Sequence, residues 1–260
     1  MSLLKEPVFL ITNDDGVYAK GIHTLVRTAE KFGEVFVVAP DRERSASSHA
    51  LTVTKPLHCK QEEPISTTQQ VYSVDGTPVD CVKLAIKNIL PRNPDFVLSG
   101  INNGSNIGCD VLYSGTIAAA MEATRHGIPA LAFSGCYKKQ NTQYGTCAQV
   151  VEKFLSSLDN LHFRNRVLNI NVPALDFAEL RGIRAAELGS WDVLEGYDEY
   201  QDPKGKKHYW LANKSQYYRE SKISDYCLID QGYVTVSVLG LDVLDKQLNQ
   251  DMVSWLPQMG

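Results

Sequence analysis

Apolar and polar residues come in blocks along the first two thirds of the chain. Unbroken apolar runs, such as Val8 to Ile11 and Val35 to Ala39, are typical of strands buried on both faces of a parallel sheet. Between these two runs, apolar residues recur at helical spacing from Gly21 to Phe32, and Gly33 follows where a helix commonly ends. The order strand, helix, strand predicts parallel strands joined by a right-handed crossover.

The same reasoning extends along most of the chain. Further strands are expected at 51–61, 70–74, 95–100, 127–134, 167–173 and 232–238, and further helices at 77–89, 117–126, 147–158 and 224–231. Thr77, Pro78 and Asp80 are the residue types of a capped helix start, so we assign the letters G-T-P to capping and not to a guanine nucleotide. We therefore predict an α/β fold, a Rossmann-like three-layer sandwich with a mostly parallel sheet.

The expected strand at 167–173 differs from the others because Asn169 and Asn171 interrupt its apolar residues. Such alternation favours a strand near the sheet edge, or one that turns both asparagines to a single face. Asn171 could support a site by contacting the residues that bind the ligand, although a structural hydrogen bond is the simpler interpretation.

The character of the sequence changes after residue 181. From 182 to 227, Trp and Tyr residues lie among many charges without a helical period, which indicates extended arms or hairpins. We divide the chain into a Rossmann-like core at 1–181 and a C-terminal extension at 182–260, whose final strand and a helix running through Trp255 return to the core. Exposed aromatic surface of this kind usually marks association, so we expect the extension to serve oligomerisation.

Composition and charge exclude several classes of protein. The net charge is −4 without a dense Lys/Arg run, which argues against duplex nucleic acid as the main partner. No apolar stretch reaches the length of a membrane span, and the first residues lack the hydrophobic region of a signal peptide. The six cysteines form no C-x-x-C pair, so zinc spacing is absent and a reducing cytoplasm is expected.

Polar residues follow three of the expected strands, at the point where each strand ends. Asp14 and Asp15 follow the first strand, Ser45 lies in the loop after the second, and Asn102 follows the strand at 95–100. The carboxyl ends of parallel strands meet at one edge of a sheet, so these four residues should lie close together.

This set of residue types suits a hard cation. Two adjacent carboxylates repel each other unless a cation lies between them, and carboxylate, hydroxyl and amide oxygens are ligands of Mg²⁺ or Mn²⁺. A polar loop with a helix cap is the alternative, because Asp is common there. For N-D-D-G after a buried strand we favour a metal site with one divalent cation per subunit.

A candidate phosphate site lies at Ser114, Gly115 and Thr116, which open the helix expected at 117–126. A helix start of this kind offers N–H donors, two hydroxyls and a favourable dipole to a phosphate. The preceding loop at 101–110 is rich in Gly and Asn and could present further N–H groups to an anion. Simple capping and a flexible connector are the alternatives. Neither the Walker lysine nor G-x-G-x-x-G is present.

Long motifs in the sequence resemble those of the SurE family, the stationary-phase survival proteins. The matching stretches are T-N-D-D-G-V-Y-A-K-G-I, V-V-A-P-D-R-E-R-S-A-S-S-H, D-G-T-P-V-D-C-V-K-L-A, L-S-G-I-N-N-G-S-N-I-G-C-D-V-L-Y-S-G-T-I-A-A-A-M-E-A and N-I-N-V-P. The resemblance implies a metal-dependent phosphatase that hydrolyses nucleoside 5′-monophosphates, with 3′-nucleotides and short polyphosphate as further substrates to test. It also implies a homodimer or homotetramer formed through the C-terminal extension, and it assigns the metal ligands to Asp14, Asp15, Ser45 and Asn102.

The mechanism that we expect is attack of a water on phosphorus, with Asp14 or Asp15 as the proton acceptor. His49 could protonate the leaving oxygen, but a packing role is equally compatible with its position. One alternative is an aspartyl-phosphate phosphatase, which normally has a residue between its two acids. Another is a regulatory module that binds metal and nucleotide without catalysis.

Overall fold

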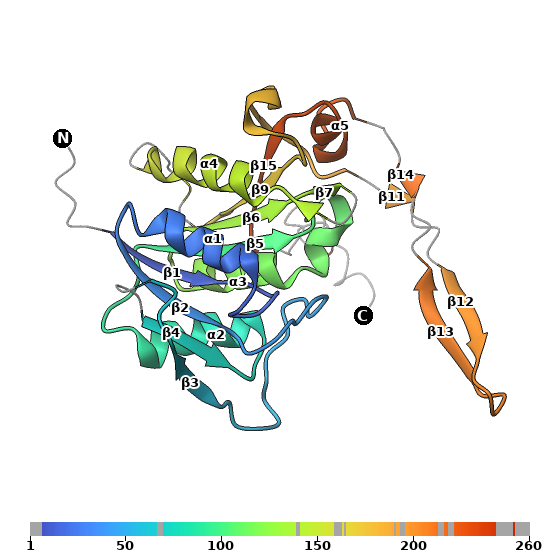
Figure 1. Ribbon diagram of the computed structural model, residues 1–260, viewed down its shortest axis with the longest axis horizontal. Helices are drawn as coiled ribbons and strands as arrows, with labels where there is room; N and C mark the ends of the chain where they lie inside the picture. Colours follow the sequence, from blue (N-terminus) through green and yellow to red (C-terminus); the bar gives the residue numbers. More distant parts are fainter. Residues whose placement is uncertain are drawn as a thin grey trace.

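The computed structural model describes residues 7–66, 70–138, 141–158, 163, 165–189, 191–192, 196–212, 216–217, 221–242 and 252. Within these residues the centre is a nine-stranded sheet in the order β10-β15-β9-β6-β5-β1-β2-β4-β3 (Figure 1). Its strands are β1 (Val8–Thr12), β2 (Glu34–Pro40), β3 (Cys59–Glu62), β4 (Gln70–Val74), β5 (Phe96–Asn103), β6 (Ala130–Gly135), β9 (Val167–Val172), β10 (Ile183–Ala185) and β15 (Val234–Leu239). The six strands from β9 to β4 run parallel, while β3 is antiparallel to β4 and β15 to β9.

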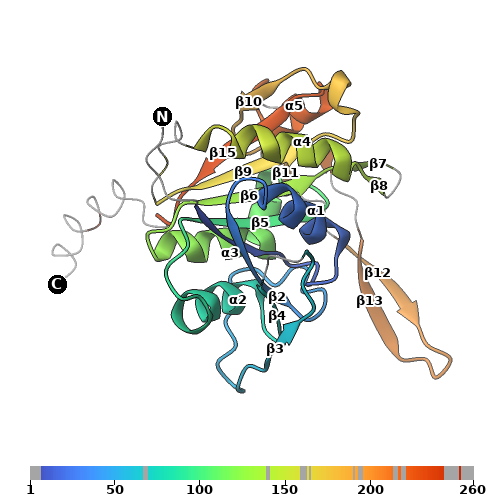
Figure 2. The same cartoon turned by 60° about the vertical axis from the view of Figure 1, so that its left-hand side comes forward.

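Helices cover both faces of the sheet, which confirms the predicted three-layer α/β architecture. The main helices are α1 (Lys20–Ala29), α2 (Pro78–Leu84), α3 (Gly115–Arg125), α4 (Tyr144–Leu155) and α5 (Asp225–Asp230). In Figure 2, α1 lies beside α4 and α2 lies near α3. Alternate residues of β1 serve the two layers: Phe9 and Ile11 pack into the cluster that contains α1 and α4, and Leu10 into the cluster that contains α2 and α3.

Two strand predictions were wrong in detail. The strand expected at 51–61 is paired only from residue 59, where β3 begins. Residues 50–58 are held by contacts to residues 75–80 instead of by a neighbouring strand. For the strand expected at 167–173 the edge alternative is wrong, because β9 lies inside the sheet between β6 and β15, and the other alternative holds, because Asn169 and Asn171 both donate to the Asn106 carbonyl. The asparagines of β9 are buried and hydrogen-bonded, so their polarity reports internal contacts and not solvent exposure.

The C-terminal extension contributes both to the sheet and to a separate arm. Strands β10 and β15 join the sheet, and Ser224 caps α5, the helix expected at 224–231. A hairpin of β12 (Gly196–Gln201) and β13 (Lys207–Ala212) projects away from the body (Figures 1 and 2). The expected helix through Trp255 lies outside the described residues. The domain boundary at 181/182 remains a prediction.

The described residues also form two short ladders and three helical turns. The pairs β7 (Tyr137–Lys138) with β8 (Asn141–Thr142) and β11 (Trp191–Asp192) with β14 (Gln216–Tyr217) are two-residue ladders. Short helical turns are η1 (Ala85–Ile89), η2 (Gly108–Leu112) and η4 (Phe177–Glu179). Among the described helices, we find none with the length and apolar content needed to cross a bilayer.

Candidate metal and phosphate site

The loops after β1 and β2 pack closely against each other at the carboxyl end of the sheet. The Val17 amide donates to the Pro40 carbonyl at 2.8 Å, and the Arg44 amide donates to the Asp14 carbonyl at 2.7 Å. Gly16 has a φ of +97°, and a Cβ there would lie 3.0 Å from the Arg42 backbone. These contacts require glycine at the turn, and they place Ser45 one residue from a direct hydrogen bond to Asp14.

Asp14 is almost fully buried at the N-terminus of α3. Its carboxylate accepts hydrogen bonds from the Thr116 amide at 3.1 Å and the Thr116 hydroxyl at 2.5 Å. Burial raises the pKa of Asp14, and the hydrogen bonds from Thr116 and Gly115 oppose that rise. A Cβ on Gly115 would lie 2.8 Å from the Asp14 Cβ, so glycine at this position permits the close approach of Asp14 to the helix.

Asp15 is more accessible, and it contacts the loop after β5. Its carboxylate accepts a hydrogen bond from the Asn103 amide at 3.0 Å. Burial, followed by the negative charges of Asp14 and Glu43, raises the pKa of Asp15 to about 6. Asn102 donates from its amide nitrogen to the Gly104 carbonyl at 2.9 Å, which leaves its amide oxygen as the atom that could coordinate a cation.

The donor set fits a hard divalent cation. Burial raises the pKa of both Asp14 and Asp15, and the charge of Asp14 raises the pKa of Asp15 further, so a cation between the two carboxylates would offset their repulsion. Among the described residues, no three His, Cys, Asp or Glu side chains are grouped for a metal. The hydroxyl of Ser45, which donates to Glu43 at 2.6 Å, and the amide of Asn102 are the neutral oxygens on the adjoining loops. A cation here would therefore be bound by oxygen alone.

The candidate phosphate residues are already engaged in internal contacts. The Ser114 hydroxyl accepts from the Ile117 amide at 3.1 Å and caps α3, and both donors of Thr116 point to Asp14. The start of α3 thus orients the Asp14 carboxylate, and Ser114 has the capping role that is the alternative to phosphate binding.

Several N–H groups of the loop at 101–110 make hydrogen bonds within the protein. The Asn103 amide donates to Asp15, the Gly104 amide to the Gly135 carbonyl, and the Gly108 amide to Asp225 at 2.7 Å. These donors are used to fix the loop, so the loop is a tightly bonded support for Asn102.

Buried amides of β9 complete that support. Asn171 accepts from the Asn106 amide at 2.8 Å, and Asn169 donates to the Asn106 carbonyl at 2.8 Å. The Asn106 side chain donates to the Ser134 hydroxyl at 2.8 Å. Asn171 therefore supports the loop that carries the candidate ligand Asn102, and in the described part of the chain none of its hydrogen bonds goes to a candidate ligand. Both asparagines of β9 bond to this loop.

His49 contacts a buried carboxylate on α3. Its Nε2 lies 3.2 Å from Glu122, which is fully buried and also accepts two hydrogen bonds from Arg125 at 3.1 Å. Those contacts lower the pKa of Glu122 against the effect of burial. His49 thus connects the loop that carries Ser45 to α3, which is the packing role considered above.

Sequence reasoning missed Tyr144, beside Asp15, and Asp225, which supports the loop at 101–110. Burial, followed by the charge of Asp15, raises the pKa of Tyr144 to about 12, and the Lys20 ammonium lies 5.5 Å from the centre of that ring. Asp225 reaches the loop at 101–110 from the C-terminal extension. Tyr144 and Asp225 are each the first residue of a helix, α4 and α5 respectively, and the spacing of residues in a helix does not indicate which distant loop its first side chain contacts.

Comparisons with known proteins agree with these motifs. Residues 9–195 match the family model described as Survival protein SurE. The chain is 41% identical to the 5′-nucleotidase SurE of Gemmatimonas aurantiaca over 250 residues, covering 95% of this chain and 97% of the relative. It is 40% identical to the 5′-nucleotidase SurE of Vibrio vulnificus over 251 residues, covering 96% and 95%.

A solved structure is similar over almost the whole length. The crystal structure of the SurE protein from Aquifex aeolicus has a TM-score of 0.82 and 37% sequence identity, and the match covers 95% of this chain and 98% of that one. Sequence and fold agree, and the chain belongs to the SurE family of survival proteins.

Proposed function

We propose that this protein is a metal-dependent phosphomonoesterase that hydrolyses nucleoside 5′-monophosphates to nucleoside and phosphate. Relatives with about 40% identity over nearly their full length carry the name 5′-nucleotidase SurE. The observation that carries the proposal is the pair Asp14 and Asp15, held at the carboxyl ends of parallel strands where α/β folds bind ligands.

One Mg²⁺ or Mn²⁺ ion would be held by Asp14, Asp15, Ser45 and Asn102. When bound, such an ion supplies a Lewis acid that polarises a phosphoryl oxygen and favours ionisation of water. The two carboxylates balance its charge, and the neutral hydroxyl and amide complete an oxygen donor set.

The chain's own groups divide the remaining work. Thr116 and Gly115 hold the Asp14 carboxylate through hydrogen bonds, which fixes its orientation. In the described contacts, Asp15 uses one carboxylate oxygen on the Asn103 amide, so we assign to Asp15 the proton taken from the attacking water. Ser114, Gly115 and Thr116 lie at the positive end of α3, which favours a phosphate dianion close by.

A phosphate-release screen tests this function. Many phosphorylated metabolites, including 5′- and 3′-nucleotides and short polyphosphate, are incubated with Mg²⁺, Mn²⁺ or EDTA in parallel. We expect release from 5′-nucleotides that depends on the metal and is lost in Asp14→Asn and Asp15→Asn. Full activity with EDTA would exclude the metal mechanism. Nucleotide binding without turnover would favour a regulatory module, and a trapped phosphoenzyme would favour an aspartyl-phosphate phosphatase.

We also propose that the active form is a homodimer or homotetramer built through the C-terminal extension. Aromatic side chains on the projecting hairpin support this proposal, because Tyr197 and Trp210 are largely exposed in the single chain. A cytoplasmic location is in keeping with the six cysteines, all of which are free thiols.

A further inference from the structure

Ser45 lies in a long loop, and the contacts of the Ser45 side chain do not explain why the loop has its observed shape. This loop, the Ser45 loop, comprises residues 41–58 between β2 and β3. Ser45 is exposed, and its hydroxyl donates to Glu43 two residues away in the same loop. Ala46 and Ser48, which follow it, have φ values of +54° and +51°, a left-handed conformation that L residues adopt at a cost in free energy. Contacts elsewhere must therefore hold the loop in this shape.

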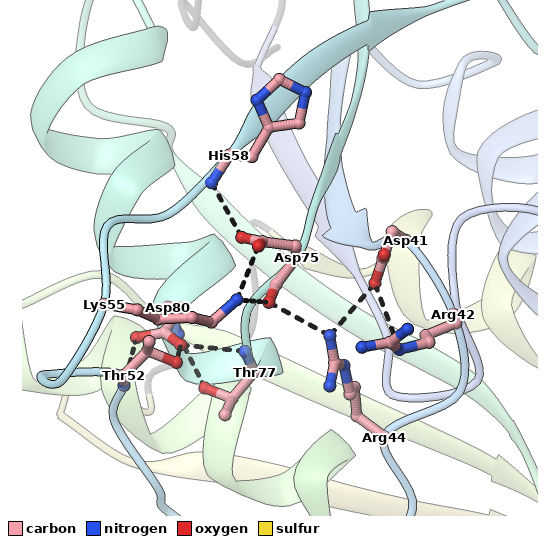
Figure 3. A network of polar contacts seen from close by, with 9 residues as sticks. All are labelled: Asp41, Arg42, Arg44, Thr52, Lys55, His58, Asp75, Thr77 and Asp80. Carbon is pink, nitrogen blue, oxygen red and sulfur yellow. Dashed lines mark hydrogen bonds and ion pairs between the residues drawn. The ribbon is translucent and has the colours of Figure 1, made fainter.

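Arg44 makes the contacts that fix the loop beside Ser45. Its backbone amide donates to the Asp14 carbonyl at 2.7 Å. Its guanidinium donates to the Asp41 carboxylate at 3.2 Å and to the Asp75 carbonyl at 3.1 Å (Figure 3). The Arg44 side chain is only 24% exposed, so these charge-assisted hydrogen bonds are partly shielded from water. One residue thus connects the start of the Ser45 loop to the Asp14 turn and to the turn after β4.

The turn after β4 is itself firmly held. The Asp75 carboxylate accepts from the Lys55 ammonium at 2.6 Å and from the His58 amide at 2.8 Å. Asp80 completes the capping box of Thr77 at the start of α2 and also accepts from the amide and hydroxyl of Thr52, at 3.0 and 2.6 Å (Figure 3). The far part of the Ser45 loop is therefore anchored to Asp80 and to Asp75, and Asp75 also accepts a hydrogen bond from Arg44. This is the structural role of the motif D-G-T-P-V-D, which the proposed chemistry leaves unexplained.

We propose that Arg44 is a positioning residue for Ser45: it sets the distance between the Ser45 hydroxyl and the aspartate pair. The proposal rests on the proposed function, because it assumes that Ser45 is a metal ligand. Arg42 is a natural control. It lies two residues away in the same loop, but its side chain is 69% exposed and its pair with Asp41 is 3.9 Å long. Such an exposed pair contributes little.

The test is a calorimetric titration with Mn²⁺ alone on the full-length protein, with thermal melts recorded for every variant. The variants are R44Q, R42Q, S45A and the double variant S45A/R44Q. We expect R44Q to weaken Mn²⁺ binding by roughly tenfold, the lower end of the effect of removing a group that orients a ligand. The Mn²⁺ affinity of R42Q should stay within about twofold of that of the unmodified protein, because exposed ion pairs contribute little. In the S45A background, R44Q should add less than about twofold, because its effect passes through Ser45.

Each result decides the matter. Mn²⁺ binding by R44Q within twofold of the unmodified protein overturns the proposal, and so does an undiminished loss from R44Q in the S45A background. If R44Q lowers the melting temperature too far, R44K replaces it. A single ammonium can reach only one of the two acceptors at a time, so an intermediate loss of affinity is expected. Absence of Mn²⁺ binding by the unmodified protein would instead remove the proposed metal site as a whole.

Discussion

At the scale of single residues, the two adjacent aspartates occupy different environments. Asp14 is buried and accepts hydrogen bonds from Thr116 at the start of α3, whereas Asp15 is more accessible and accepts a hydrogen bond from the Asn103 amide. The two residues lie in the bend after β1, and their carboxylates contact different segments, the start of α3 and the loop after β5. The pair thus presents two carboxylates with separate supports, which lets one be held rigidly while the other remains available for chemistry.

The Thr116 hydroxyl should be needed to orient Asp14. Replacing Thr116 by Val removes the hydrogen bond of 2.5 Å and leaves a buried carboxylate oxygen without that donor. We expect Mn²⁺ affinity to fall by roughly tenfold, measured by titration. Thr124→Val is the matched control, because Thr124 lies in the same helix but its hydroxyl donates to the Met121 carbonyl at 2.8 Å. Equal losses in both variants would contradict a specific role.

Asp110 should make the stability of the protein depend on pH. Burial, followed by the charge of Asp225, raises the pKa of Asp110 to about 6, above its ordinary value of 3.8. The unfolded chain therefore ionises first, and the folded state loses stability as the pH rises from about 4 to 6. Asp110→Asn should gain about 1–2 kcal/mol in unfolding free energy at pH 8, a figure reduced for partial solvent screening.

The gain in Asp110→Asn should shrink as the pH falls through 6 and vanish below about pH 3, where the carboxyl is protonated in both the folded and the unfolded state. Urea unfolding at a series of pH values measures it. A gain that is the same at pH 4 and pH 8 would show that the asparagine stabilises by contacts instead of by removal of charge.

At the scale of elements, close packing of helices on strands sets the site. Gly21 lies in the first turn of α1, where a Cβ would come within 1.9 Å of the Ile101 carbonyl oxygen on β5. Ile101 precedes Asn102, so the distance between α1 and β5 also determines where that candidate ligand lies. Glycine at this position is a requirement of helix–sheet contact and not of local backbone conformation.

Gly21→Ala should therefore destabilise the protein and disturb the site. We expect a loss of about 1–3 kcal/mol in unfolding free energy, because the added methyl group overpacks the interface. Mn²⁺ affinity should fall as well. Gly145→Ala is the control: Gly145 is the second residue of α4, as Gly21 is of α1, and a Cβ there meets nothing within 4 Å. It should raise stability by about 0.5–1 kcal/mol. Denaturant unfolding of both variants distinguishes these outcomes.

At the scale of the whole molecule, the C-terminal extension is both part of the fold and a projecting arm. Strand β15 pairs with β9, and Asp225 holds the Gly108 amide, so this part of the chain supports the loop of Asn102. The hairpin of β12 and β13 instead carries exposed Tyr and Trp side chains away from the sheet (Figure 1). An isolated two-stranded hairpin is marginally stable in water, so we expect it to pack against a second copy of the chain.

Removal of apolar surface from the hairpin should weaken assembly without loss of the fold. The double variant Tyr197→Ser and Trp210→Ser is expected to shift the protein toward monomer in sedimentation velocity, while its circular dichroism remains unchanged. Val53→Ser, a substitution of an 83% exposed side chain in the Ser45 loop, is the control and should not alter the sedimentation coefficient. An unmodified protein that is monomeric at all concentrations would refute assembly through the hairpin.

Local sequence determined most elements of this protein. Solid apolar runs identified β1, β2 and β5, and Thr77 with Asp80 marked the start of α2, because burial and capping depend on residues close in the sequence. The topological rule for parallel strands then indicated which loops should meet, and the structure brings the backbone beside Ser45 and Asn102 to the aspartate pair.

Tertiary structure alone decided what each polar group does. The donors of Thr116 and of the loop at 101–110 could equally have faced an anion, and only packing directs them to Asp14, Asp15 and Asp225. Likewise Arg44 reaches Asp75, 31 residues away in the sequence, through a turn that no local pattern links to it. Hydrogen-bond partners are set by distance in space and by exclusion of water, and neither is encoded in the spacing of residues along the chain.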